Sequence, residues 1–152
     1  MGRYLMAAIF MIAMQAQAEL VIHDATVRAM PPGQPNTAAF LKLENTSKQA
    51  ITLVSASTSV AKKAEFHTHV KNSQGVMSMQ QVPSIEIAAG ETFVFQSGSY
   101  HIMLMGLNKP LKPGENVSIS VKDKKGRDYT YKIPVVSMMG GKHMHHHHHG
   151  EE

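Results

Sequence analysis

The amino-acid sequence predicts an all-β protein with a single domain, either a β-sandwich or a barrel. From Leu20 onward the chain contains about ten short runs rich in branched and aromatic residues, each bounded by turn-forming residues. Their spacing of roughly 8–12 residues is typical of β-sandwiches and barrels. No segment has a convincing apolar period of about 3.6 residues, which would indicate a helix.

The predicted strands follow one another with short connections between them. The longer connections are two Pro- and Gly-rich loops at 30–36 and 108–115, and the stretch NSQG at 72–75 is typical of a hairpin. The expected strands are 20–29, 37–45, 50–57, 64–70, 75–82, 83–91, 92–96, 100–107, 116–122 and 127–136.

The two ends of the chain differ from this domain. Residues 1–18 have the pattern of a secretory signal peptide, with Arg3, an apolar run over 5–14 and Ala-Gln-Ala before Glu19. The apolar run is short for a membrane anchor, so we expect cleavage, a periplasmic protein and no membrane span afterwards. We expect the β-sandwich domain over 19–136 and a flexible His- and Met-rich tail over 137–152.

Composition excludes several classes of function. The chain has no cysteine, which argues against a blue-copper site, an iron–sulfur cluster and a dithiol redox couple. Its 15 lysine and arginine residues exceed the 11 acidic ones, but the lysines are scattered and no aromatic residues interleave with them. A nucleic-acid partner is therefore not expected. No catalytic motif is visible either, so we expect a binding protein rather than an enzyme.

Methionine and histidine occur as pairs two residues apart. Such pairs are His67 with His69, Met77 with Met79, and Met103 with Met105, which follow His101. On a strand, residues two apart lie on one face, so three strands each present soft or borderline ligands. Imidazole with thioether favours Cu(I) over zinc, magnesium or calcium.

The simpler interpretation is that these methionines fill the core, as single strand methionines usually do. Two observations weaken it. The core faces of the strands are already supplied by other residues, Phe66 and Val70 on one and Ile102 and Leu104 on the other. The methionines share the opposite face with the histidines, which is expected to be the non-core face.

The spacing of these residues resembles the motif of the periplasmic copper chaperones of the PCuAC family. That motif is a His, an optional Met, a Met after ten further residues, a His after twenty-one more, and a Met one residue beyond. Here His67, Met79, His101 and Met103 stand at these positions, with Thr68 in the optional place. The segments DATVRAMPPGQPNTAAFLKLEN, SIEIAAG and MLMGL are also similar to the family.

The resemblance implies a cupredoxin-like Greek-key β-sandwich that binds Cu(I) through these four residues. It also implies delivery of copper to cytochrome c oxidase, through its subunit II or a Sco-like protein, or a more general role in periplasmic copper supply. We expect a monomer. We expect His69 to be peripheral, Met105 to be a spare thioether or a packing residue, and His23 to lie on the surface. Whether Met77 joins the site is left open by the sequence.

The C-terminal tail contains a second group of ligands. An expression tag is one interpretation, but the run is interrupted by a methionine and followed by Gly-Glu-Glu. A native tail of this kind would bind Cu(II) through neutral imidazole. Its expected ligands are His143, Met144, His145, His146, His147, His148 and His149.

Three other functions remain open at this point. A metal buffer or copper-resistance protein would depend mainly on the tail. An electron-transfer cupredoxin would share the fold, but the absence of cysteine argues against it. An adhesion or structural sandwich would make the His and Met face incidental, and such a protein would bind no Cu(I).

Overall fold

The computed structural model describes residues 19–137, and every regular element in this range is a β-strand. This confirms the all-β prediction. The predicted signal peptide and almost all of the predicted tail lie outside the described residues. The ten strands are β1 Leu20–Arg28, β2 Asn36–Asn45, β3 Ile51–Thr58, β4 Ala61–Lys71, β5 Met77–Gln81, β6 Ile85–Ile87, β7 Thr92–Phe95, β8 His101–Leu107, β9 Asn116–Asp123 and β10 Asp128–Val136.

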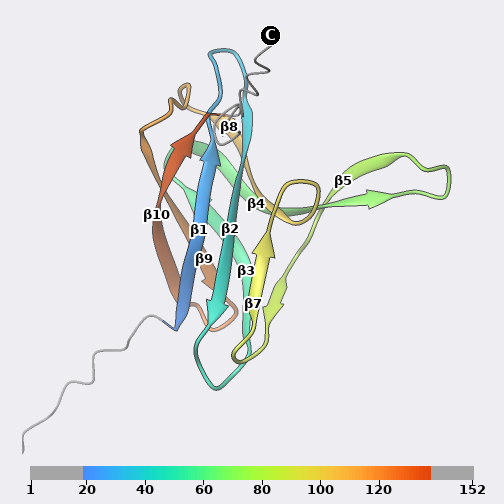
Figure 1. Cartoon of the computed structure of the whole chain (residues 1–152), viewed down its shortest axis with the longest axis vertical. Coiled ribbons are helices and arrows are strands. Elements are labelled where there is room, and N and C mark those ends of the chain that lie inside the picture. Colours follow the sequence, from blue (N-terminus) through green and yellow to red (C-terminus); the bar gives the residue numbers. More distant parts are fainter. Residues whose placement is uncertain (1–18, 138–152) are drawn as a thin grey trace, which may run out of the picture.

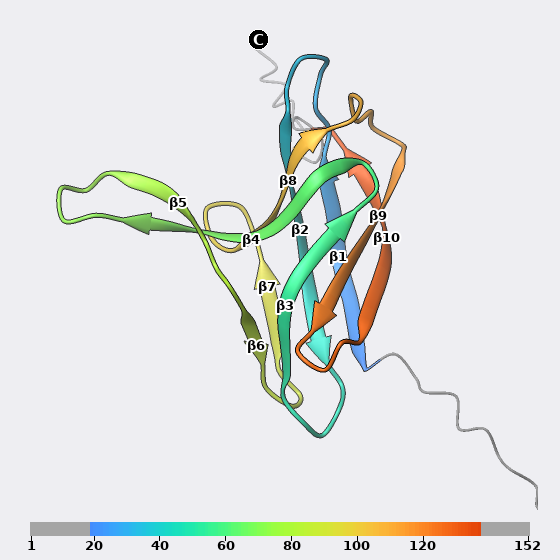
Figure 2. The ribbon, with the colours of Figure 1, turned by 180° about the vertical axis from the view of Figure 1, so that it is seen from behind.

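Seven of the strands form a closed ring. The order β4-β8-β2-β1-β10-β9-β3 is continuous, and the pair Ala56–Ala64 links β3 back to β4. The pairings are antiparallel except that between β1 and β10. The ring is flattened, with β1 and β2 nearer in Figure 1 and β3 nearer in the reverse view of Figure 2. The predicted sandwich is therefore confirmed. Hydrogen bonds join its two layers at the edges, so that the seven strands form a flattened barrel.

The core lies between these layers and follows the two-residue period of the strands. In β2, for example, Ala39, Leu41 and Leu43 are buried while Lys42 between them is exposed. In β8, Ile102 and Leu104 are fully buried in the same core. A register shift of one residue would turn these apolar side chains toward solvent. Their burial therefore fixes which face of each strand points outward.

One hairpin projects from the ring. The second half of β4 and all of β5 extend away from the body as an arm, joined by the turn at 72–75 (Figures 1 and 2). Every residue of β5 is exposed, and β5 has a neighbour on only one side. No helix in the described part of the chain is long and apolar enough to cross a membrane.

Candidate metal centre

The inner half of the candidate site is built on β4 and β8. Phe66 of β4 points into the core, so its neighbours Glu65 and His67 lie on the outer face. The same alternation in β8 buries Ile102 and turns His101 outward. These two strands pair in antiparallel register with His67 directly opposite His101, and their ring centroids are 6.0 Å apart.

The outer half of the site is built on the arm. The hairpin register places Met79 of β5 directly opposite His69 of β4, and Met77 opposite Lys71. Side chains of directly opposite residues are close neighbours on one face of a sheet. Met77 and Met79 are each about half exposed, at 55% and 51%. The arm therefore carries a thioether, Met79, that is near imidazole but open to solvent.

These groups meet at a pocket of about 350 Å³. Its walls come from the end of β1, the start of β2, the arm, the turn before β8, and β8 itself. His67 lies next to His101 but is not among the lining residues. The lining residues are Arg28, Met30, Asn36, Thr37, Ala38, Phe40, His69, Met79, Ser97, Gly98, His101 and Met103.

His101 is held as a neutral imidazole with one nitrogen available. Although it lies on the outer face, only 3% of the residue is exposed, because the arm and the turn before β8 cover it. Burial lowers its pKa, opposed by its hydrogen bond to the Ser99 carbonyl, and electrostatic interactions with the neighbouring His69, His67 and Arg28 lower it further. Nδ1 lies 3.1 Å from the Ser99 carbonyl, which can only accept, so Nδ1 carries the proton. Nε2 makes no hydrogen bond to residues 19–137, and its lone pair is free to bind a metal.

His67 shows the complementary arrangement. Its Nε2 donates to the Glu65 carboxylate at 2.8 Å, so in the neutral form of this imidazole Nδ1 is the nitrogen that carries the lone pair. Nδ1 is buried and has no hydrogen-bond partner among the described residues. A buried polar atom without a partner costs free energy, so an absent ligand is one physical reason for its presence. A carboxylate on the second nitrogen is also the usual way in which proteins orient a metal-binding histidine.

The donor set fits a soft monovalent ion. Residues 19–137 contain no group of three or more His, Cys, Asp or Glu side chains placed to hold a metal together. The set expected from the sequence is of a different kind, because two of its four members are thioethers. Neutral imidazole and thioether together suit Cu(I), which is soft and has no strong geometric requirement.

The structure adds residues that the sequence did not reveal. We expected His69 to be peripheral, but it lines the pocket, and its ring lies 5.4 Å from that of His101, closer than the ring of His67. Glu65, Arg28 and Phe40 were not expected at all. Alternation along β4 gave a signal for Glu65 and His69, but nothing local to Arg28 or Phe40 indicated this pocket.

The remaining residues from the sequence lie at its margins. Met77 and Met105 do not line the pocket, and Met105 is opposite Asn36 at the far end of β8. His23 is on the surface as expected, 3.6 Å from Glu44. The tail residues from His143 to His149 lie outside the described residues.

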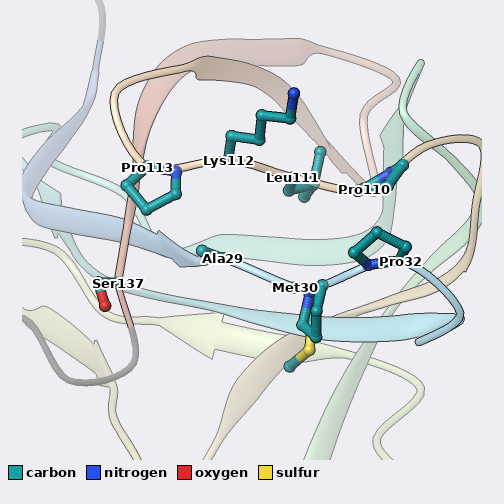
Figure 3. Close-up of a pocket in the computed structure, with 9 residues that line it drawn as sticks. Ala29, Met30, Pro32, Pro110, Leu111, Lys112, Pro113 and Ser137 are labelled. Carbon is teal, nitrogen blue, oxygen red and sulfur yellow. The ribbon is translucent and has the colours of Figure 1, made fainter.

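A second pocket, of about 320 Å³, lies beside the first and is of a different kind. Its walls are mainly proline rings and Leu111, from the loop after β1 and the loop before β9 (Figure 3). Met30 lines both pockets. No titratable group except Lys112 is among the residues found to line this second pocket, so it lacks the imidazoles of the first.

The chain is also similar in sequence to known proteins. Residues 20–135 match the family described as "Putative lipoprotein LpqE-like". The chain is 33% identical over 120 residues to "Putative lipoprotein Lxx21020" of Leifsonia xyli subsp. xyli, covering 78% of this chain and 70% of that protein.

The fold of this chain is also similar to those of solved structures. Apo-DR1885 from Deinococcus radiodurans is 37% identical, with a TM-score of 0.62, over 93% of this chain and 97% of that one. Its Cu(I) form is 39% identical, with a TM-score of 0.59, over 83% and 82%. The copper-bound PCuAC domain from PmoF2 is 15% identical, with a TM-score of 0.65, over 81% and 97%, a likeness of fold. The chain belongs to the LpqE-like family and has the PCuAC fold, as the spacing of its histidines and methionines predicted.

Proposed function

We propose that this protein is a periplasmic copper chaperone that holds Cu(I) at the pocket between the arm and the barrel. The observation that carries the proposal is that Met79, His101 and Met103 line one pocket, with His67 paired directly opposite His101. These residues come from the β4–β5 hairpin and from β8, about 20 residues further along the chain. Two of these side chains each have one imidazole nitrogen without a hydrogen-bond partner, and two are thioethers. The Cu(I) form of DR1885, at 39% identity, supports the choice of metal.

The division of the site between barrel and arm suggests how copper would leave. His101 and His67 are fixed in the barrel by hydrogen bonds to Ser99 and Glu65. Met79 stands on an exposed strand and can move away without breaking the core. A ligand from an acceptor can then take its place, so that copper is exchanged between ligands and never released. This is binding and transfer, not catalysis.

We infer the place of action and the acceptor from the resemblance to the copper chaperones and from the relatives. The description of the family and of the Leifsonia relative as lipoproteins supports a location in the cell envelope, in line with the signal peptide expected at 1–18. The acceptors we propose are cytochrome c oxidase subunit II or a Sco-like protein. The histidines of the tail, from His143 to His149, would bind Cu(II) as a separate store.

A titration with Cu(I) tests the domain site directly. The six tail histidines would each be replaced by glutamine in the full-length chain, so that only the pocket competes with a chromophoric Cu(I) chelator. We expect one tight equivalent, and a loss of at least 100-fold in affinity in the double variant His101→Ala and Met103→Ala, because half of the ligands are gone.

The outcomes separate the alternatives. No tight Cu(I) binding without the tail histidines would instead support a metal buffer that depends on the tail. A comparison of His67→Gln with His69→Gln then tests the ligand set itself. We expect the larger loss for His67→Gln, and the reverse order would replace His67 by His69 in the set.

A further inference from the structure

Arg28 stands in the pocket as a fixed positive charge. Its guanidinium lies 4.8 Å from the centre of the Phe40 ring, and Nη2 donates to the Ser97 hydroxyl at 3.2 Å. The Phe40 ring in turn lies 6.4 Å from the His101 ring. Stacking and a hydrogen bond together hold the guanidinium beside the residues that we propose as ligands.

No acidic group of residues 19–137 forms an ion pair with this charge. Arg28 forms no ion pair with any Asp or Glu of residues 19–137, whereas Arg127 pairs with both Asp123 and Glu19. Arg28 is also the only Lys, Arg, Asp or Glu among the residues that line the pocket. The nearest acidic side chain on the ligand strands, Glu65, is hydrogen-bonded to His67 and does not line the pocket. The pocket proposed to bind a copper cation thus also contains the positive charge of Arg28, which is not paired with an acidic side chain of residues 19–137.

We propose that Arg28 makes the pocket selective for monovalent over divalent ions, and so for Cu(I) over Cu(II). This inference rests on the proposed function. The electrostatic repulsion between a fixed charge and a bound ion is proportional to the charge of the ion. If Arg28 lowers the affinity for Cu(I) by a given factor, it lowers the affinity for Cu(II) by the square of that factor.

The ligands explain why the pocket can tolerate this repulsion. Thioether and imidazole bind Cu(I) favourably, so a moderate loss leaves a useful affinity. With an effective dielectric constant of about 20 and a separation of about 10 Å, the repulsion is worth roughly a tenfold change for a monovalent ion. The corresponding change for a divalent ion is then roughly a hundredfold.

The test compares the two oxidation states in one pair of variants. In the full-length chain with the six tail histidines replaced by glutamine, Arg28→Gln removes the charge and keeps a hydrogen-bonding group near Ser97. Arg28→Lys keeps the charge but not the planar stack. Lys48→Gln removes one positive charge from the turn after β2, at the other end of the barrel. Affinities are measured at low ionic strength, by competition with one chelator for Cu(I) and another for Cu(II).

We expect Arg28→Gln to raise the affinity for Cu(I) roughly tenfold and that for Cu(II) roughly a hundredfold. The ratio of these changes lowers the reduction potential of the bound copper by about 59 mV. Arg28→Lys is expected to stay close to the parent, and Lys48→Gln to change neither affinity measurably.

Two results would overturn the inference alone. One is an equal change in both affinities, including no change, in Arg28→Gln. The other is an Arg28→Lys variant that behaves like Arg28→Gln, since shape rather than charge would then matter. If the parent with tail histidines replaced bound no Cu(I), the proposed function would fail first, and the inference with it.

Discussion

The two ends of the barrel each bury a titratable side chain, but they treat it in opposite ways. At the end where β9 turns into β10, Asp123 is 2% exposed and accepts four hydrogen bonds, from the backbone of Lys125 and Arg127, the Arg127 side chain and the Tyr129 hydroxyl. At the other end, His101 is 3% exposed but makes one hydrogen bond.

The difference indicates what each end is for. A buried polar group that is fully satisfied stabilises the local structure, and Asp123 ties the last turn together in this way. A buried group with a free lone pair contributes less to stability than it could. At the His101 end, the Nδ1 atom of His67 is in the same condition. One end of the barrel is therefore complete by itself, and the other has donor atoms left for a ligand.

The largest expected effect tests the free donor atom of His101. The variant His101→Gln keeps most of the volume and a group that can donate to the Ser99 carbonyl, but it removes the imidazole. We expect the affinity for Cu(I) to fall at least 100-fold, about 2.7 kcal/mol, because a principal ligand is lost. Competition with a Cu(I) chelator measures this, and unfolding in urea is expected to shift by less than about 1 kcal/mol.

The reverse pattern is expected at the other end. Asp123→Asn removes the charge that Arg127 and Tyr129 contact, and we expect it to lower the free energy of unfolding by about 2 kcal/mol. The affinity for Cu(I) should remain within about twofold of the parent, because independent and distant sites rarely couple. A large loss of copper binding in Asp123→Asn would show that the two ends are not independent.

The comparison also shows what sequence could and could not predict. The alternation of branched residues predicts all ten strands, and spacing two apart predicts that His67 and His69 share the outer face. Alternation cannot say which of them faces Met79, because the hairpin register decides this and both histidines satisfy the two-residue period. Asp123 ends β9, and its burial depends on contacts with Arg127 and Tyr129 across the turn, which no local pattern predicts.

The sequence could not predict which residues from distant segments reach the pocket. Arg28 ends β1, and it reaches the pocket because β1 pairs with β2 and Phe40 provides a ring on which it stacks. The parallel pairing of β1 with β10 likewise joins the first and last strands, which no local pattern connects. Such contacts depend on the whole sheet, whereas strand propensity and alternation are local.

A smaller effect is expected from pH. Burial raises the pKa of Asp123, but the hydrogen bonds from Arg127, Tyr129 and Lys125 outweigh it and hold the pKa below the ordinary value of 3.8. The folded state therefore binds this proton less readily than the unfolded state does. The stabilisation is complete above the ordinary pKa and is lost as pH falls through the folded-state value.

Urea unfolding at a series of pH values below about 5 measures this loss. We expect the stability of the parent to fall more steeply with acid than that of Asp123→Asn, so that the difference between them shrinks as pH decreases. Parallel curves for the two proteins would mean that Asp123 has the same pKa when folded and unfolded, and that its four hydrogen bonds do not favour the charged form.

The smallest effect separates two methionines that differ little except in what lies opposite them. Met77 and Met79 are on the same face of β5 and almost equally exposed, but Met79 is opposite His69 and Met77 is opposite Lys71. If the arm completes the ligand shell of His101, Met79→Ala should weaken Cu(I) binding about tenfold, while Met77→Ala should change it less than twofold. Both variants should unfold like the parent, because neither side chain is part of the core. Equal losses would mean that the arm attracts copper through any exposed thioether. A group other than Met79 would then be the further ligand of a copper ion bound to His101.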